Sequence, residues 1–87
     1  LRAREAMLRS GFEVLGTVVE VRENRNVRVN RKHPWVVRYA YAVQGAAYEG
    51  RETIFELPAG LVQGAQVKIA YDRAMPKRSV LKFDKVD

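Results

Sequence analysis

Apolar and polar side chains alternate along most of this chain with a period of two residues, which is the period of a β-strand. The alternation is clearest from Trp35 to Val43. Five large apolar side chains share one face of this segment: Trp35, Val37, Tyr39, Tyr41 and Val43. Gln44-Gly45 follows and predicts a tight turn. Residues 47–57 alternate again, so we expect them to return as the partner strand.

Other segments also predict strands. Residues 12–22 are rich in β-branched side chains, which favour a pleated, half-buried strand. Gly16 lies within this segment and predicts a bulge or a sharp bend. Residues 66–71 and 79–83 predict the last two strands, and residues 27–30 predict a short strand or one arm of a hairpin.

The one helical pattern lies at the start of the chain. Residues 1–10 contain good helix formers and end at Ser10-Gly11, a common helix stop. No later segment offers the long crossover that parallel strands need. We therefore predict an all-β fold. It is a small antiparallel barrel of five or six strands, OB-like or SH3-like, over residues 11–87, preceded by a short helix over residues 1–10.

Size and composition narrow the class of protein. Eighty-seven residues make one domain with a thin core. The hydrophobic fraction of 47% and the charged fraction of 30% are those of a folded chain. The absence of cysteine excludes disulfides and thiolate metal sites. No apolar segment approaches the ~20 residues that span a bilayer.

The residues that usually perform catalysis are few and scattered. His33 is the single histidine, and we expect it to be a solvated loop residue. The carboxylates, serines and threonines form no recognisable nucleophile or acid–base arrangement. The sequence therefore predicts no enzyme, no catalytic residue, no cofactor, no metal site and no small-molecule substrate.

The net charge of +6 is concentrated in one segment, residues 22–38, in which Glu23 is the only acidic residue. We predict that this basic hairpin contacts an anionic partner. Its candidate contact residues are Arg22, Arg25, Arg28, Arg31, Lys32, Trp35 and Arg38. Three kinds of partner fit this chemistry: a nucleic acid, anionic lipid headgroups and a protein. The bases of a nucleic acid would stack on Trp35. A merely solvated surface is the alternative, and we expect Tyr39 and Tyr41 to be core.

The C-terminal half contains a spaced motif. It reads Gly64-x-x-Val67-x-Ile69-x-Tyr71-Asp72-x-x-x-Pro76-x-x-Ser79-x-Leu81. This motif resembles the closing motif of an uncharacterised bacterial domain-of-unknown-function family. The earlier segments Gly16-Thr17-Val18-Val19 and Tyr48-Glu49-Gly50 agree with that resemblance.

The resemblance implies a small membrane protein in which a β-domain adjoins one or two transmembrane helices. Arg2, Arg4 and Arg9 would then follow an upstream anchor, and the positive-inside rule would place the domain in the cytoplasm. We expect a non-catalytic accessory or interaction domain of such a protein, with an unknown protein or an anionic membrane surface as its partner. The alternative is a nucleic-acid-binding barrel that uses the basic hairpin.

The residues Tyr71, Asp72, Pro76 and Ser79 of the motif have a structural interpretation. A strand that ends in Tyr-Asp before a proline-containing loop lets the aspartate accept backbone N–H groups, as in an Asx turn. Ser79 is expected to do the same where the chain re-enters the sheet. The motif would then hold the last strand in register.

Overall fold

A computed structural model describes residues 11–82, which form five strands and no helix. The strands are β1 (Phe12–Glu23), β2 (Trp35–Val43), β3 (Ala46–Ile54), β4 (Gln66–Tyr71) and β5 (Ser79–Lys82). The helix predicted over residues 1–10, and Phe83 at the end of the last predicted strand, lie outside the described residues.

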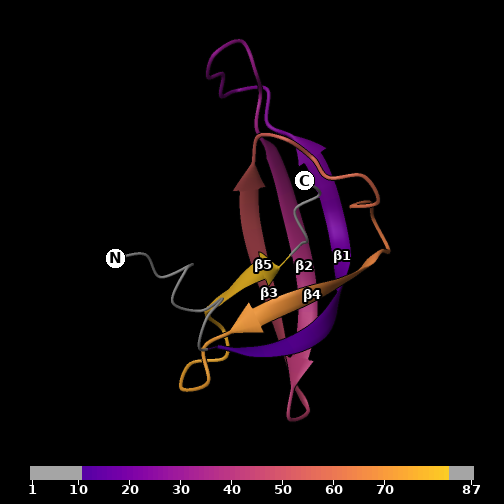
Figure 1. The fold of residues 1–87 in the computed structure, drawn as a ribbon, viewed down its shortest axis with the longest axis vertical. Coiled ribbons are helices and arrows are strands. Elements are labelled where there is room, and N and C mark those ends of the chain that lie inside the picture. Colours follow the sequence, from indigo (N-terminus) through magenta and orange to yellow (C-terminus); the bar gives the residue numbers. More distant parts are fainter. Residues whose placement is uncertain (1–10, 83–87) are drawn as a thin grey trace.

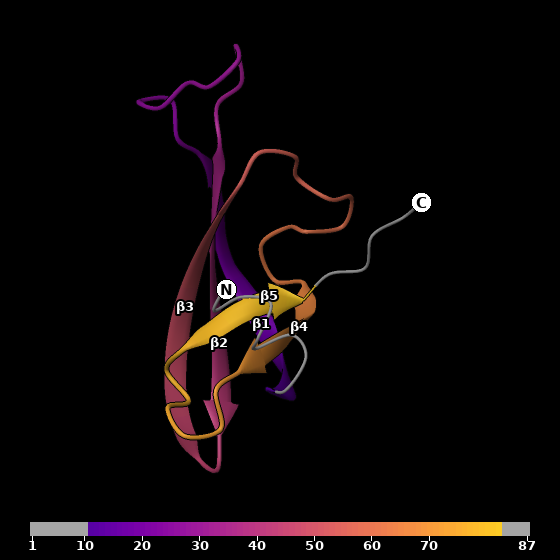
Figure 2. The ribbon, with the colours of Figure 1, turned by 60° about the vertical axis from the view of Figure 1, so that its left-hand side comes forward.

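The strands form a single sheet in the order β3-β2-β1-β4-β5, and every neighbouring pair is antiparallel. The sheet curls into a half-barrel, so that β5 comes to lie beside β3 (Figures 1 and 2). The backbone N–H of Leu81 on β5 donates to Glu52 Oε1 on β3 at 2.9 Å. This bond links the two ends of the sheet. The prediction of an all-β, antiparallel fold is confirmed.

The curl is built into β1. Its first half pairs with β4 and its second half with β2, and Thr17 pairs with both neighbours. The register shifts between Val18 and Glu20, so the bulge predicted at Gly16 lies slightly later in the strand. Gly16 instead allows β2 and β4 to pack closely against β1 at this point. A Cβ atom at this position would lie 2.3 Å from Ile69 Cδ1 and 2.5 Å from the Ala40 carbonyl oxygen, and the backbone oxygen cannot move away without disturbing the sheet.

The core lies on the concave face of the half-barrel. Its buried residues are Val18, Val37, Tyr39, Tyr41, Leu61, Ile69 and Leu81. The ring of Tyr41 stacks between Tyr39 and Tyr48, with centroid distances of 6.0 and 5.6 Å. The prediction that one face of β2 is the core face is therefore confirmed for Tyr39 and Tyr41.

The two buried tyrosines also carry polar contacts across the barrel interior. The Tyr39 hydroxyl lies 2.9 Å from Ser79 Oγ, and the Tyr41 hydroxyl donates to the Pro76 carbonyl at 2.6 Å. Gly50 faces Tyr39 across the β2–β3 pair. A Cβ atom at Gly50 would lie 2.3 Å from Tyr39 Cζ, so the tyrosine ring occupies the space that a side chain would need.

The Tyr41 hydrogen bond yields a test of this interior. We expect Tyr41→Phe to lower the free energy of unfolding by about 1 kcal/mol, because it leaves the Pro76 carbonyl without its phenolic donor. Urea denaturation followed by circular dichroism measures the change. Tyr48→Phe is the control, since its hydroxyl has no partner among the described residues. Equal effects from the two variants would contradict the assignment.

Candidate functional site: the β1–β2 loop

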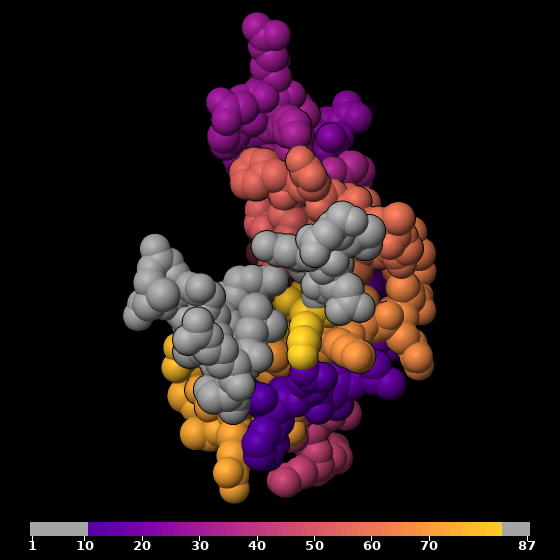
Figure 3. All heavy atoms as spheres, in the orientation of Figure 1, coloured from indigo at the N-terminus to yellow at the C-terminus, as the bar shows by residue number. Residues whose placement is uncertain are grey.

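The loop between β1 and β2, residues 24–34, projects from one end of the half-barrel (Figures 1 and 2). The space-filling view shows its outer part rising above the rest of the molecule (Figure 3). Within the loop, the charged residues at neutral pH are all basic: Arg25, Arg28, Arg31 and Lys32. This β1–β2 loop contains four of the seven predicted contact residues.

Hydrogen bonds order the loop from its base to its tip. The N–H of Asn24 donates to the Pro34 carbonyl at 2.8 Å and closes the base. Asn24 Oδ1 accepts the N–H of Asn26 at 3.1 Å, which forms an Asx turn. Nearer the tip, Val29 and Lys32 exchange two backbone hydrogen bonds of 2.8 and 2.9 Å. The loop is therefore a small hairpin, one of the two forms predicted for this segment.

His33 belongs to this ordered structure. Its side chain is half-buried, and Nδ1 lies 2.8 Å from the carbonyl oxygen of Val27. A tautomer with a proton on Nδ1 donates there and fastens the two arms of the loop together. His33 is thus a part-exposed loop residue, as expected, and its ring in addition holds a backbone carbonyl, which the sequence did not predict.

The turn at the tip is strained. Asn30 has φ 52° and Arg31 has φ 66°, and positive φ at both central residues defines a type I′ turn. Asparagine tolerates this left-handed region, whereas arginine at the second position replaces the glycine that such turns prefer. An arginine is thus held in an unfavourable conformation in the turn that joins the two arms of the loop.

Several of the predicted basic residues are neutralised by ion pairs. Arg22 Nε lies 3.8 Å from Glu20 and Arg25 Nε lies 2.9 Å from Glu23. Lys32 Nζ lies 3.4 Å from Glu56. Arg38 lies on β2, away from the loop, and contacts both Glu20 at 2.9 Å and Glu49 at 3.5 Å. Exposed pairs of this kind contribute little to stability, but they do lower the local charge.

Arg28 and Arg31 differ from these residues. Neither forms an ion pair with a carboxylate of residues 11–82, and both are exposed. The uncompensated charge therefore lies at the tip of the loop rather than along all of residues 22–38. The sequence could not give this distribution, because Glu20, Glu49 and Glu56 lie outside that segment.

Trp35 is not placed beside the exposed arginines. It is the first residue of β2, half-buried, and in phase with the inward-facing Val37 and Tyr39. Its cross-strand neighbours are Glu23 and Ile54. Since Tyr39 and Tyr41 are buried as well, the structure does not bring the aromatic residues and the loop arginines together on one surface.

Two apolar residues of the loop are exposed instead. Val27 retains 42% and Val29 retains 46% of its accessible surface, and they alternate with Arg28 in the sequence. Phe55 is also exposed at this end of the barrel, next to Glu56, which contacts Lys32. Sequence reasoning assigned the valines to a strand or hairpin arm and did not identify them as exposed site residues.

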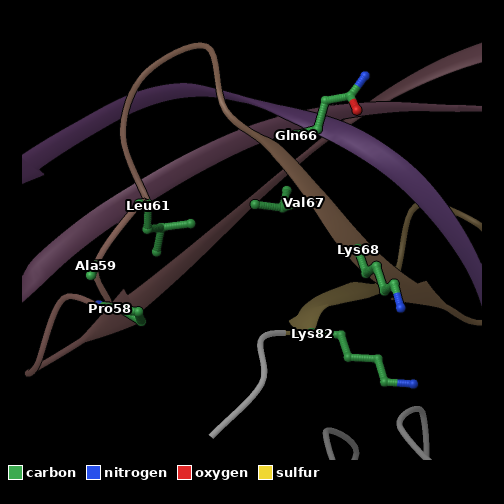
Figure 4. A pocket seen from close by; sticks show the side chains of 8 residues that line it. Pro58, Ala59, Leu61, Gln66, Val67, Lys68 and Lys82 are labelled. Atoms are coloured by element: carbon green, nitrogen blue, oxygen red, sulfur yellow. The ribbon is translucent and has the colours of Figure 1, made fainter. Parts of the chain in front are cut away.

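A shallow depression lies on another part of the surface (Figure 4). Its lining includes Leu61, Val67, Lys68 and Lys82. Lys82 donates to Glu13, and this hydrogen bond, together with the charges of Lys82 and Lys68, lowers the pKa of Glu13. The volume of about 220 Å³ is below the usual range for ligand pockets, roughly 300–1,000 Å³. It is a weaker candidate site than the loop.

No group of three or more His, Cys, Asp or Glu side chains in residues 11–82 is arranged to hold a metal ion. Over the same residues, no helix has the length and apolar character required to cross a membrane.

The residues of the C-terminal motif are engaged in structural contacts. Asp72 Oδ1 accepts the N–H of Ala74 at 2.8 Å, which is the predicted Asx turn. Tyr71 packs edge-on against Phe12 at 6.1 Å. Ser79 differs from the expectation, because its hydroxyl contacts the Tyr39 hydroxyl and not a loop N–H. The Pro76 carbonyl accepts from Tyr41, so this loop is joined to the core.

Comparison with known proteins gives one finding. The family model described as "Domain of unknown function (DUF3592)" matches residues 14–85. Searches of the curated proteins and of the solved structures returned no match.

The Asx turn at Asp72 leads to a stability prediction. We expect Asp72→Ala to lower the free energy of unfolding by about 1 kcal/mol or more, since the Ala74 N–H loses its acceptor. Asp72→Asn retains a side-chain oxygen and should recover most of the loss. Thermal melts of the wild type and of the two variants measure the change in stability. An unchanged melting temperature for the alanine variant would count against the turn.

The strained tip leads to a second prediction. Arg31→Gly should leave stability unchanged or raise it by up to about 1 kcal/mol, because the relief of left-handed strain outweighs the added freedom of the unfolded chain. Arg28 has negative φ, so Arg28→Gly removes the same charge and should only destabilise. Urea midpoints compare the two variants. A larger loss for Arg31→Gly than for Arg28→Gly would refute the assignment of strain.

Proposed function

Because this chain belongs to the DUF3592 family, a family of domains of unknown function, we propose a role argued from its own residues. In this proposal the chain is a non-catalytic interaction domain of a membrane-anchored bacterial protein, and the β1–β2 loop is its binding element. The single observation that carries this proposal is the loop itself: four cations and no acidic residue on an ordered, projecting hairpin.

The charges of the loop support an anionic partner. The ion pairs of Arg25 and Lys32 are exposed, with side-chain accessibilities of 82% and 59% for the two cations. Pairs of this kind are weak, so both cations can exchange their carboxylates for the anionic groups of a partner. Arg28 and Arg31 need not break any ion pair of the described residues to do so.

The membrane-anchored context rests on the resemblance of the C-terminal motif and on Arg2, Arg4 and Arg9 near the start of the chain. A basic segment of this kind follows the cytoplasmic end of many transmembrane helices. We propose the cytoplasmic side for the domain on the same ground.

We further propose that the half-barrel is OB-like. Since β5 lies beside β3, the strands follow one another around the barrel as β1, β2, β3, β5 and β4. A partly open barrel of five strands is the general description of that fold. In OB-folds the loop between the first two strands is often part of the ligand site, which agrees with the position of the β1–β2 loop.

A nucleic acid is the second candidate partner, favoured by this strand order and by the basic loop. Binding of single strands in OB-folds combines such loops with aromatic stacking on the face of strands 2 and 3. Here the tyrosines of β2 face the core. The other face of β2 carries the buried Val36 and the more accessible Arg38, Ala40 and Ala42, and none of these residues offers a ring. The nucleic acid therefore ranks second.

Chromatography of the domain on heparin, a sulfated polymer, tests the binding element. We expect the double variant Arg28→Gln/Arg31→Gln to elute at clearly lower salt than the wild type, because the two uncompensated cations are removed. The control variant is Arg51→Gln/Lys68→Gln, which removes two exposed charges from β3 and β4.

The two variants have the same net charge, so non-specific attraction affects them equally. A larger shift for the loop variant supports the loop as the binding element. Equal shifts, or an unchanged elution of the loop variant, would refute it.

A further inference from the structure

We propose that the β1–β2 loop docks on an anionic lipid surface, with Val27 and Val29 entering the interfacial region and Arg28 and Arg31 contacting lipid phosphates. This inference rests on the proposed function, since it assigns a partner to the same binding element. It adds a chemical role for the apolar residues, which a purely electrostatic site does not need.

The exposed valines are the first argument. Single exposed apolar residues are common on protein surfaces, but Val27 and Val29 are neighbours on the most projecting element of the molecule, with 42% and 46% of their surface accessible. Aliphatic side chains lose contact with water when they enter the boundary between headgroups and acyl chains. A lipid surface is the polyanion that offers such an apolar layer directly below its charges.

The arrangement of charge is the second argument. Arg28 lies between the two valines in sequence, and Arg31 occupies the turn that joins Val29 to Lys32. The cations therefore accompany the apolar residues on one small tip, where each near the surface adds about 1 kcal/mol of attraction to anionic lipid. Arginine also binds phosphate oxygens in a bidentate manner.

The same tip fits a nucleic acid less well. Stacking of bases needs aromatic rings, and the β1–β2 loop has none among its eleven residues, 24–34. Phe55 is exposed at this end of the barrel, but it is a single ring and lies outside the loop. A phosphate backbone would use the arginines but leave the valines in water. Substitution of the valines therefore distinguishes lipid binding from nucleic-acid binding.

The order of the loop is the third argument. The contacts of Asn24, His33 and the Val29–Lys32 pair hold the tip in one conformation. Binding then orders few additional residues, so less conformational entropy opposes docking. The left-handed Arg31 keeps a cation at the turn at some cost in stability, as is found at functional sites.

Co-sedimentation with vesicles tests the inference. The domain is mixed with vesicles of equimolar phosphatidylcholine and phosphatidylglycerol, or of phosphatidylcholine alone. We expect binding to the anionic vesicles only. Val27→Ser/Val29→Ser should weaken it on the order of tenfold or more, as two valine side chains lose their burial. Arg28→Gln/Arg31→Gln should weaken it at least about tenfold.

Val62→Ser is the matched control, because Val62 is 57% exposed in another loop, and it should bind like the wild type. The valine variant should also elute from heparin like the wild type, which shows that its charges and fold are intact. A valine variant that binds anionic vesicles as tightly as the wild type overturns lipid insertion and leaves the proposed function standing.

Two other outcomes also overturn the inference. One is the absence of vesicle binding by the wild type. The other is tighter binding to a single-stranded oligonucleotide than to the anionic vesicles at equal salt, which would make nucleic acid the partner. Failure of the proposed function is recognised separately, because the loop arginine variant would then elute from heparin like its charge-matched control.

Discussion

The packing of Tyr39 and Tyr41 inside the curled sheet is the contact on which the rest of this fold depends. A chain of this size has room for one thin layer of core, and these two rings fill much of it. Tyr39 occupies the space above Gly50, and the sheet closes around Gly16. Through their hydroxyls the same residues hold Ser79 and the Pro76 carbonyl, so the core also positions the β4–β5 connection and the last strand.

This use of the aromatic residues determines where binding can occur. The tyrosines of β2 are buried in the core, so β2 presents no exposed aromatic ring on which a ligand could stack. Its outward face carries alanines and ion pairs such as Arg38–Glu20. Groups of exposed cations without a carboxylate partner among residues 11–82 lie in the β4–β5 connection, at Arg73, Lys77 and Arg78, and at the tip of the β1–β2 loop, at Arg28 and Arg31. The rigid sheet beneath it supports a short, ordered loop, which is a common division of labour between scaffold and site.

The strands could be predicted from the sequence because period-two alternation and β-branched residues act locally, as in Trp35–Val43. The Gln44-Gly45 turn could be predicted for the same reason. The exact bulge position and the contact between β3 and β5 could not, since both depend on residues distant in the chain, such as Ile69 against Gly16 and Leu81 against Glu52. For the candidate site, the distribution of charged residues along the sequence was enough to identify the basic segment, residues 22–38. The pairing of some of its cations with Glu20, Glu49 and Glu56, and the exposure of Val27 and Val29, arise only when the chain folds.

The topology places a constraint on any anchored arrangement. Phe12 and the β1–β2 loop lie at opposite ends of β1, so an anchor upstream of Leu1 would enter the barrel far from the loop. A barrel lying along the membrane surface would bring both ends of β1 to the same bilayer. The opposite end of the barrel carries the exposed cations Arg73, Lys77 and Arg78, with Arg73 over the Phe12 ring. An anionic surface would therefore attract both ends, and this favours the lying orientation over an upright one.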